Sequence, residues 1–325
     1  MMFEELMPET IDAVRQQLGD NVLTTPTMRF HGARIGRIAP DVELYIKLEL
    51  FQYTGTFKAR GAMNVVRNLG PEELARGITA VSAGNHAIAA AYCAAAFHTS
   101  ARIFMPKAAK QVRIDKAKSY GAEVIFCDSQ TEMFERAEMA QRDEGRTFVH
   151  PFEGVFTVQG TATVGLEIAS QAPPLDMMIL PVGGGGLCSG VASYLKQVNP
   201  EINIVGVEPE GANVMALSFE NNGPVVKEEV NTIADSLAPP RSEPYTYAVC
   251  REYVDRLIQV SDAELVEGMR VLQEDMKLTV EPAAAATTAA LLSRKLGDLT
   301  GQRVGVIACG ANIDFEDYTS LLSNS

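Results

Sequence analysis

The sequence lacks tryptophan altogether and is poor in the residues that build disulfide or zinc sites. The cysteines are odd in number, widely spaced and without a Cys-x-x-C pair, which argues against both kinds of site. The five are Cys93, Cys127, Cys188, Cys250 and Cys309. Of the four histidines, only His86 lies in a recognisable motif. We therefore expect reduced thiols that mostly fill the core.

Basic residues and long apolar runs are also scarce. The chain has 28 Lys and Arg against 41 Asp and Glu, a net charge of −13 that disfavours a nucleic-acid partner. No uninterrupted apolar run approaches the roughly 18 residues that a membrane span needs, and the first residues lack the apolar region of a signal peptide. We expect a cytoplasmic protein with neither nucleic-acid nor membrane partners.

Strand patterns alternate with helix patterns along most of the chain, and the connections are short. This alternation predicts an α/β protein with open, mostly parallel sheets covered by helices. We expect a small β/α lobe over residues 77–151 and a larger lobe from residues 1–76 and 152–325, with the ligand at the carboxyl ends of the strands. Strands are predicted at 42–47, 77–81, 101–105, 123–127, 176–182, 202–207 and 304–308, and helices at 8–19, 58–68, 87–97, 111–120 and 188–198.

Lys58 lies where a short glycine-containing turn meets the start of an alanine-rich helix, in the stretch Thr54-Gly-Thr-Phe-Lys-Ala-Arg-Gly-Ala62. The free N–H groups and the dipole of a helix start disfavour a nearby cation, which biases this amine toward its neutral, nucleophilic form. Neutral lysines form Schiff bases with carbonyl compounds, including pyridoxal phosphate. The alternative is an ordinary surface lysine.

Four consecutive glycines, Gly183 to Gly186, follow an apolar strand and precede a helical pattern that begins with Leu187. Without Cβ atoms, consecutive N–H groups can turn toward one anion at the helix start, so this loop predicts a phosphate site. It lacks the Lys-Ser/Thr of a P-loop and the third glycine of a dinucleotide fingerprint. The alternative is a plain tight turn.

Two further strand ends carry polar residues. The loop Ser82-Ala-Gly-Asn-His86 precedes a helix, so its N–H groups and the Asn85 amide can hold a carboxylate, unless Ser82 or Asn85 is simply a helix cap. The last apolar strand ends at Cys309-Gly-Ala-Asn312, where the thiol either fills the core or faces a heterocyclic nitrogen as a weak neutral partner.

Taken together, these motifs resemble the threonine/serine dehydratase and serine racemase group of fold-type II pyridoxal-phosphate enzymes, whose fold is that of the tryptophan synthase β subunit. The resemblance covers nearly the whole chain in order. It rests on Lys47 to Ala62, Ser82 to His86, Gly183 to Leu187, Val207-Glu-Pro209, Val280-Glu-Pro282 and Cys309 to Asn312.

The resemblance implies roles for individual residues. Lys58 would form the Schiff base, Phe57 would flank the pyridine ring, Asn85 would bind its 3′-oxygen, Cys309 would face its nitrogen, and Glu281 would lie near the ring edge. A thiol is no full counter-ion, so the ring would be a modest electron sink that favours β-elimination. The phosphate would bind to Gly183, Gly184, Gly185, Gly186 and Leu187, and the substrate carboxylate to Ser82, Ala83, Gly84, Asn85 and His86.

The chain departs from the group's pattern at two places. Ala83 stands where racemases carry a second serine that acts as acid and base, so two-base racemisation is not expected. At the group's divalent-metal site Glu208 and Ala212 are present, but Val214 replaces the second acid, so we expect any metal to bind weakly.

The expected activity is that of a pyridoxal-phosphate-dependent ammonia-lyase acting on a β-hydroxy L-amino acid, with threonine and serine as the leading substrates. Lys58 would remove the α-proton, and the cofactor phosphate would assist departure of the hydroxyl as water. Products would be a 2-oxo acid and ammonia. A homodimer is expected by resemblance alone.

Several alternatives stay open at the level of sequence. A dehydratase of 3-hydroxyaspartate could bind the second carboxylate through Arg241, in the proline-rich loop 236–245, although an exposed arginine in a rigid surface turn is the favoured interpretation of this residue. A serine racemase is the less favoured relative. A cofactor-binding or sensor protein without turnover is a different class, and a nicotinamide-dependent enzyme is the most distant alternative.

Overall fold

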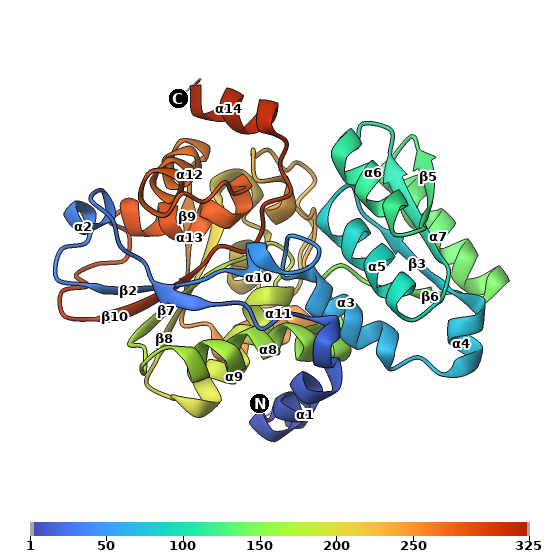
Figure 1. Ribbon diagram of the computed structural model, residues 1–325, viewed down its shortest axis with the longest axis horizontal. Helices are drawn as coiled ribbons and strands as arrows, with labels where there is room; N and C mark the ends of the chain where they lie inside the picture. The colour runs from blue at the N-terminus through green and yellow to red at the C-terminus, as the bar shows by residue number, and fades with distance from the viewer. Residues whose placement is uncertain (1–2, 324–325) are drawn as a thin grey trace.

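The computed structural model describes residues 3–323 and contains two β-sheets in two lobes, which lie side by side in Figure 1. The larger sheet has six strands in the order β1-β2-β10-β7-β8-β9, all parallel to their neighbours except β1, which pairs antiparallel with β2. Its strands are β1 (Thr27–Arg29), β2 (Glu43–Lys47), β7 (Met177–Pro181), β8 (Asn203–Pro209), β9 (Arg256–Val260) and β10 (Arg303–Ile307).

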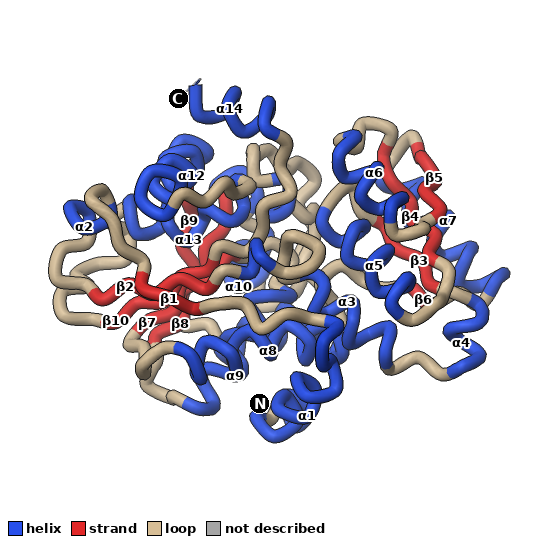
Figure 2. The backbone as a smooth tube through the Cα atoms, viewed as in Figure 1, coloured by secondary structure: helices blue, strands red, loops and turns tan. Residues whose placement is uncertain are grey.

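The smaller sheet has four parallel strands in the order β5-β4-β3-β6. Three helices follow its strands in a repeated strand–helix pattern, α5 (Asn85–Ala96), α6 (Gln111–Ser119) and α7 (Gln130–Glu144). Parallel strands need such crossovers, and the helices cover both faces, as Figure 2 shows. The strands are β3 (Ile78–Val81), β4 (Ala101–Pro106), β5 (Glu123–Cys127) and β6 (Thr147–Phe148).

Helices pack on both faces of the larger sheet (Figures 1 and 2). One face is covered by α8, α9 and α11, and the other by α12 and α13. The bounds are α1 (Pro8–Leu18), α2 (Ile35–Ile38), α3 (Lys58–Arg67), α4 (Pro71–Arg76), α8 (Val155–Gln171), α9 (Gly186–Val198), α10 (Val214–Glu220), α11 (Pro244–Tyr253), α12 (Asp262–Met276), α13 (Pro282–Leu292) and α14 (Phe315–Ser323). Short 3₁₀ turns are η1 (Glu4–Leu6), η2 (Gly19–Asn21), η3 (Glu49–Phe51), η4 (Glu210–Ala212) and η5 (Asp235–Leu237).

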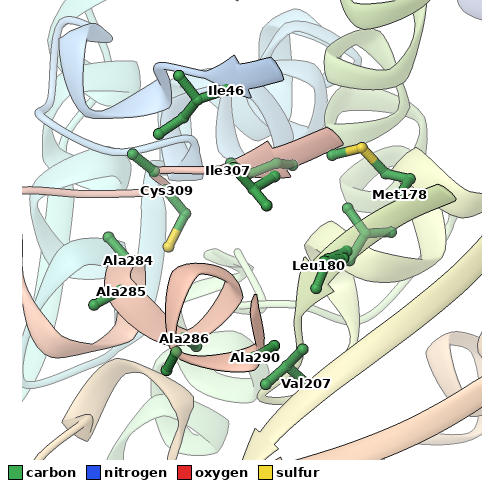
Figure 3. Close-up of a cluster of buried hydrophobic side chains, with 14 of the residues drawn as sticks. Ile46, Met178, Leu180, Val207, Ala284, Ala285, Ala286, Ala290, Ile307 and Cys309 are labelled. Atoms are coloured by element: carbon green, nitrogen blue, oxygen red, sulfur yellow. The ribbon is translucent and has the colours of Figure 1, made fainter. Parts of the chain in front are cut away.

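The core of the larger lobe lies where the strands meet the alanine-rich helix α13. Figure 3 shows Met178, Leu180, Val207 and Ile307 gathered beside this helix. Small residues, Ala284 to Ala286, let α13 approach the sheet closely, and all of these side chains are buried. Burial of apolar area of this kind is the main stabilising contribution, about 25 cal/mol per Å².

Helix α3 belongs to the cores of both lobes. Its residues Ala62, Met63 and Val66 pack with the strands of the smaller sheet, whereas its other face crosses α8 of the larger lobe. The crossing is close because a Cβ on Gly160 would lie 2.4 Å from the Arg60 carbonyl oxygen. Lys58 is the first residue of this shared helix.

The predicted α/β class with mostly parallel sheets is confirmed, and every predicted strand occurs within two residues of its expected bounds. Helix α5 begins at Asn85 instead of Ala87, so Asn85 and His86 lie in its first turn. Strands β1, β6 and β9 were not predicted. The division at residues 76 and 152 stays a prediction, because all strands respect it but α1 and α3 contribute to the core of the smaller sheet. Within residues 3–323, no helix is both long and apolar enough to cross a membrane.

Candidate active site

Lys58 lies at the junction of the two lobes, at the start of α3. Its Nζ donates a hydrogen bond to the backbone oxygen of Pro151 (2.5 Å) and lies 5.2 Å from the centroid of the Phe57 ring. The amine and the Phe57 ring line one pocket, together with Asn85, the glycine loop, Glu281 and Cys309. The structure therefore brings together residues that are up to 252 positions apart in the sequence.

Burial lowers the pKa of the Lys58 amine to about 8, although Cys309 and Glu281 act in the opposite direction. Desolvation penalises the charged form of a lysine, and here it outweighs the attraction of the two acidic groups. A larger share of the amine is consequently neutral near pH 8 than for a solvated lysine. The amine is thus suited to nucleophilic attack.

A buried ion-pair cluster fixes the helix that carries Lys58. The fully buried Arg60 guanidinium pairs with Glu49 (Nε to Oε2, 2.8 Å) on η3 and with Glu167 (Nη2 to Oε2, 2.7 Å) on α8. Lys47 also pairs with Glu167 (2.7 Å). Since charges are stable in a core only when they are paired and hydrogen-bonded, this cluster holds α3 in a defined position against α8.

The glycine loop forms the opposite wall of the pocket. It joins β7 to α9, and Gly185 has a φ of +89°, in the left-handed region that favours glycine. A Cβ on Gly184 would lie 2.3 Å from the Phe152 ring, and one on Gly186 would lie 2.8 Å from the Phe152 carbonyl oxygen. Within residues 3–323 the backbone N–H groups of 183–187 donate no hydrogen bond, so they are free to bind an anion at the start of α9.

The Asn85 side chain connects four elements of the site. Its amide donates to Glu281 Oε1 (2.7 Å) and to Ser236 Oγ (3.1 Å), and its oxygen accepts from Asn312 (2.8 Å). Asn85 comes from the smaller lobe, whereas its three partners come from the larger lobe. These contacts place the predicted cofactor-binding amide at the mouth of the pocket.

Glu281 is a buried carboxylate, only 2% exposed, with one unsatisfied oxygen. Within the described chain, Oε2 accepts no hydrogen bond, and the nearest cation, Arg113 Nη2, is 4.0 Å away. Burial raises the pKa of Glu281, although the Asn85 hydrogen bond and the Arg113 charge oppose the shift. A buried polar atom without a partner is rare in native proteins, and here it indicates a ligand.

Both histidines beside the pocket are held neutral. His86 Nε2 bonds the Val149 backbone oxygen (2.7 Å), and burial lowers the pKa of His86 to about 3. His150 Nδ1 accepts from the N–H groups of Phe152 and Glu153 (3.3 and 2.9 Å), and burial lowers its pKa to about 3 as well. Neither ring therefore carries a charge or titrates near neutral pH.

A local hydrogen bond stabilises the turn before α5, in which Ser82 Oγ accepts from the Gly84 N–H (3.0 Å). Gly84 faces the guanidinium of Arg113, which a Cβ would approach to 2.9 Å, while Ala83 is exposed. Arg113, on α6, pairs with Asp235 (2.5 and 3.3 Å) and donates to the Asn312 backbone oxygen (3.2 Å). This arginine joins the loop of residues 82–86 in the smaller lobe to two segments of the larger lobe.

Cys309 follows β10 and is 3% exposed. Burial raises the pKa of its thiol well above the ordinary value, and the nearby Glu281 charge adds to the shift. The group is therefore a neutral thiol at neutral pH. It lines the pocket with Lys58, as expected for a neutral partner of a ring nitrogen.

Arg241 lies outside the residues that line the Lys58 pocket. Its side chain is 47% exposed, pairs with Glu243 (2.6 Å) and lies 5.2 Å from the centroid of the Phe134 ring. A contact from Arg241 to a second substrate carboxylate stays a prediction.

The proposed metal position is occupied by backbone hydrogen bonds. The two carboxylate oxygens of Glu208 accept from the N–H groups of Met215 (2.7 Å) and Ala216 (2.8 Å) at the start of α10, and burial raises the pKa of Glu208 to about 8. Across residues 3–323, no group of three His, Cys, Asp or Glu side chains is placed to hold a metal ion. Weak metal binding at Glu208 and Ala212 remains an untested prediction.

Sequence analysis missed four residues that complete the site. Pro151 accepts the Lys58 hydrogen bond, and Phe152 packs on the glycine loop. They follow the short strand β6, whose two residues give no periodic signal. The other two come from a helix and a short turn that carry no motif of their own: Arg113 and Ser236. Asn312 was part of the strand-end motif, but no role was predicted for its side chain.

The residues present fit pyridoxal phosphate. A glycine cradle with free N–H groups suits the phosphate, and a neutral-biased lysine suits the aldehyde. The unsatisfied Glu281 oxygen and the neutral Cys309 thiol lie in the same pocket and suit the ring.

Comparisons with known proteins agree with this geometry. The chain is 46% identical over 275 residues to a phenylserine dehydratase of Ralstonia pickettii (85% of this chain, 84% of that protein). It is 36% identical over 318 residues to an L-threo-3-hydroxyaspartate ammonia-lyase of Saccharomyces cerevisiae (97% and 95%).

Solved structures give the same result. Maize serine racemase superposes with a TM-score of 0.90 at 33% identity (97% of this chain, 96% of that chain), and the processed form of threonine deaminase isoform 2 from Solanum lycopersicum with 0.87 at 30% (96% and 93%). The model of the family described as "Pyridoxal-phosphate dependent enzyme" matches residues 21–310, a range that contains the lysine, the glycine loop and the strand-end thiol. The residues that line the pocket agree with this match, and the chain belongs to the pyridoxal-phosphate dependent enzymes, in the fold-type II group.

Proposed function

We propose that this protein is an ammonia-lyase that dehydrates a β-hydroxy L-amino acid to a 2-oxo acid and ammonia. The observation that carries the proposal is that Lys58, with its lowered pKa, and the glycine loop with free N–H groups line one pocket. The dehydratases and ammonia-lyases among its relatives support the reaction class. Threonine and serine are the leading substrates, and the phenylserine dehydratase at 46% identity makes a β-phenyl side chain the first to test beside them.

Each residue of the pocket has its own role in the proposed reaction. Pyridoxal phosphate, when bound, supplies an electron sink that acidifies the α-proton of an attached amino acid. Lys58 holds the cofactor and then, as a free amine, removes that proton. Asn85 orients the ring through its 3′-oxygen, and the N–H groups of residues 183–187 hold the phosphate.

Substrate binding is assigned to the loop of residues 82–86. Its N–H groups at the start of α5 suit a carboxylate, and neutral His86 adds no competing charge. Arg113, whose own side chain is only 8% exposed, packs against Gly84 of this loop. The carboxylate of the substrate is thereby fixed beside the Lys58 amine.

Two neighbouring activities are less well supported. Racemisation needs an acid–base group on the face opposite Lys58, and Ala83 cannot move a proton. A 3-hydroxyaspartate substrate is favoured by the yeast relative, but Arg241 already pairs with Glu243. A protein that binds the cofactor without turnover would leave the perturbed Lys58 unexplained.

A substrate panel tests the proposal. The purified protein, loaded with pyridoxal phosphate, is assayed for ammonia with L-threonine, L-serine, 3-phenylserine and 3-hydroxyaspartate, and Lys58→Ala serves as the inactive control. We expect ammonia from at least one substrate and none from the variant. Ammonia from no member of the panel would refute the proposal.

We further propose a cytoplasmic homodimer. The net charge of −13 supports a freely dissolved protein. Leu23, Phe51 and Tyr53 are exposed (36%, 50% and 45%) and adjacent, because Gln52 bonds the Leu23 backbone, which supports an apolar contact surface. Sedimentation equilibrium would show twice the chain mass, and Phe51→Glu would shift it toward the monomer.

A further inference from the structure

Ser236 is a hydroxyl group inside the Lys58 pocket to which no role has been assigned. It is the middle residue of η5 and lines the pocket with Lys58, Asn85 and Glu281. Its neighbour Leu237 packs on Gly183 of the glycine loop, and its neighbour Asp235 pairs with Arg113 beside Gly84. Ser236 therefore lies between the expected phosphate end and the expected substrate-carboxylate end of the site.

Hydrogen-bond partners lie on both sides of this hydroxyl. Ser236 Oγ accepts from the Asn85 amide (3.1 Å) and donates to Asp235 Oδ1 (3.2 Å). Glu281 is a second acidic neighbour, and a hydrogen bond from Ser236 is among the influences that lower its pKa against the effect of burial. Asp235 is itself held by the Arg113 guanidinium. The Oγ is adjacent to the amide that is expected to hold the 3′-oxygen, so it would lie near the edge of a bound cofactor to which the substrate is attached.

The surrounding charges decide which part of a substrate Ser236 can contact. Asp235 and Glu281 place two acidic groups beside it, and only Asp235 has a close cationic partner. A substrate carboxylate there would be repelled, whereas a neutral hydroxyl can both donate to the acids and accept from Ser236. The β-hydroxyl is the one neutral polar group that every proposed substrate carries.

We propose that Ser236 binds the β-hydroxyl of the substrate and stabilises it as it departs, an inference that rests on the proposed dehydratase function. Its O–H turns from Asp235 to the leaving oxygen. The Cβ–O bond breaks, and the oxygen keeps the electron pair. The electron pair of the Cα–H bond forms the Cα=Cβ double bond. The proton that the Lys58 amine takes from Cα passes on to the leaving oxygen, so the amine is neutral again and water is lost overall without an oxidant or reductant. Ser236 keeps its own proton.

The test compares two leaving groups. L-serine loses a hydroxyl, which needs hydrogen-bond support, whereas β-chloro-L-alanine loses chloride, which does not. In the holoenzyme, Ser236→Ala should lower kcat/KM for L-serine by about 10- to 100-fold, the range for one hydrogen bond to developing charge, and leave that for β-chloro-L-alanine within about threefold. Ser236→Gly, which also lacks the hydroxyl, serves as a second variant if the alanine form folds poorly.

Further measurements separate this role from a structural one. Ser170→Ala removes an exposed hydroxyl that bonds only the Glu167 backbone, and it should change neither substrate. The visible absorbance of the loaded Ser236→Ala protein should equal that of the wild type. An equal loss on both substrates, or a changed spectrum, would overturn the inference while leaving the dehydratase proposal intact. A wild-type protein inactive on both substrates would overturn the two together.

Discussion

At the scale of single residues, the reactivity of Lys58 depends on burial more than on helix position. The helix start disfavours the charged amine, but desolvation is the largest cause of the lowered pKa. The amine attacks an aldehyde only when neutral, so its reactivity should increase with pH through a midpoint near 8. At pH 7 about one tenth of the amine is neutral.

The first prediction follows from the lowered pKa of the Lys58 amine. When apo-protein is mixed with pyridoxal phosphate between pH 6 and 11, the rate of appearance of the visible band should rise with pH through a midpoint near 8. Stopped-flow absorbance measures it, with Lys58→Ala as the control that shows no band. A midpoint near 10.5, the ordinary value for lysine, would contradict the burial argument.

The second prediction concerns the glycine loop. Gly184→Ala would bring a Cβ to 2.3 Å from the Phe152 ring, so either the ring or the loop must move. We expect a loss of about 1–3 kcal/mol in the free energy of unfolding and at least tenfold weaker binding of pyridoxal phosphate. Chemical denaturation and a cofactor titration measure the two effects. Gly36→Ala, where a Cβ would meet nothing within 4 Å, should change neither.

At the scale of elements, the pairing of α3 with α8 depends on charges as much as on apolar contact. Arg60, Glu49 and Glu167 are almost completely buried, so each needs the others. Arg60→Met keeps the length of the side chain but leaves two carboxylates without their shared partner. We expect a loss of about 3–5 kcal/mol in the free energy of unfolding, measured in urea.

A matched control shows whether the loss of stability comes from the burial of the ion pair or from the loss of any ion pair. Arg29 pairs with Glu43 at the surface, where both side chains are about half exposed. Solvent and salt screen this pair, so Arg29→Met should cost less than about 1 kcal/mol. Equal losses for the two variants would show that the buried cluster contributes nothing special.

At the scale of the whole molecule, Arg113 and Lys116 of α6 connect the lobes. Arg113 bonds Asp235 and Asn312, and Lys116 donates to Asn312 Oδ1 (2.9 Å) and to the Thr54 backbone (3.2 Å). Beside them a cavity of about 330 Å³ opens between α6, the loop after β10 and α14.

The fourth prediction tests this connection. Arg113→Ala should raise KM for the substrate by about tenfold or more and speed amide hydrogen exchange in residues 111–119 and 310–314, because the contact between the lobes loses its ion pair with Asp235. Mass spectrometry of peptides measures the exchange. Arg142→Ala, an exposed arginine that pairs with the adjacent Asp143, is the control and should leave both unchanged.

The sequence was informative where a motif and a strand end coincide. Lys58, Asn85, the glycine loop and Cys309 could be predicted because each follows or precedes a strong apolar pattern, and the structure places them in one pocket. Their individual roles toward the cofactor stay predictions. Pro151, Arg113 and Ser236 could not be found, since their importance arises from tertiary contacts over distances of 93, 122 and 151 residues. The single-turn helix η5 gives no periodic signal at all.

The double membership of α3 has a consequence for how the protein unfolds. Unfolding of the smaller sheet would remove the apolar residues against which Met63 and Val66 of α3 pack. If α3 then moved, Arg60 would lose its ion pairs, and the buried Glu49 and Glu167 of the other lobe would be left without this partner. The two sheets therefore form a single cooperative unit despite their separate outlines. Scanning calorimetry should give one heat-absorption peak, with a van't Hoff enthalpy equal to the calorimetric one, and two resolved peaks would contradict it.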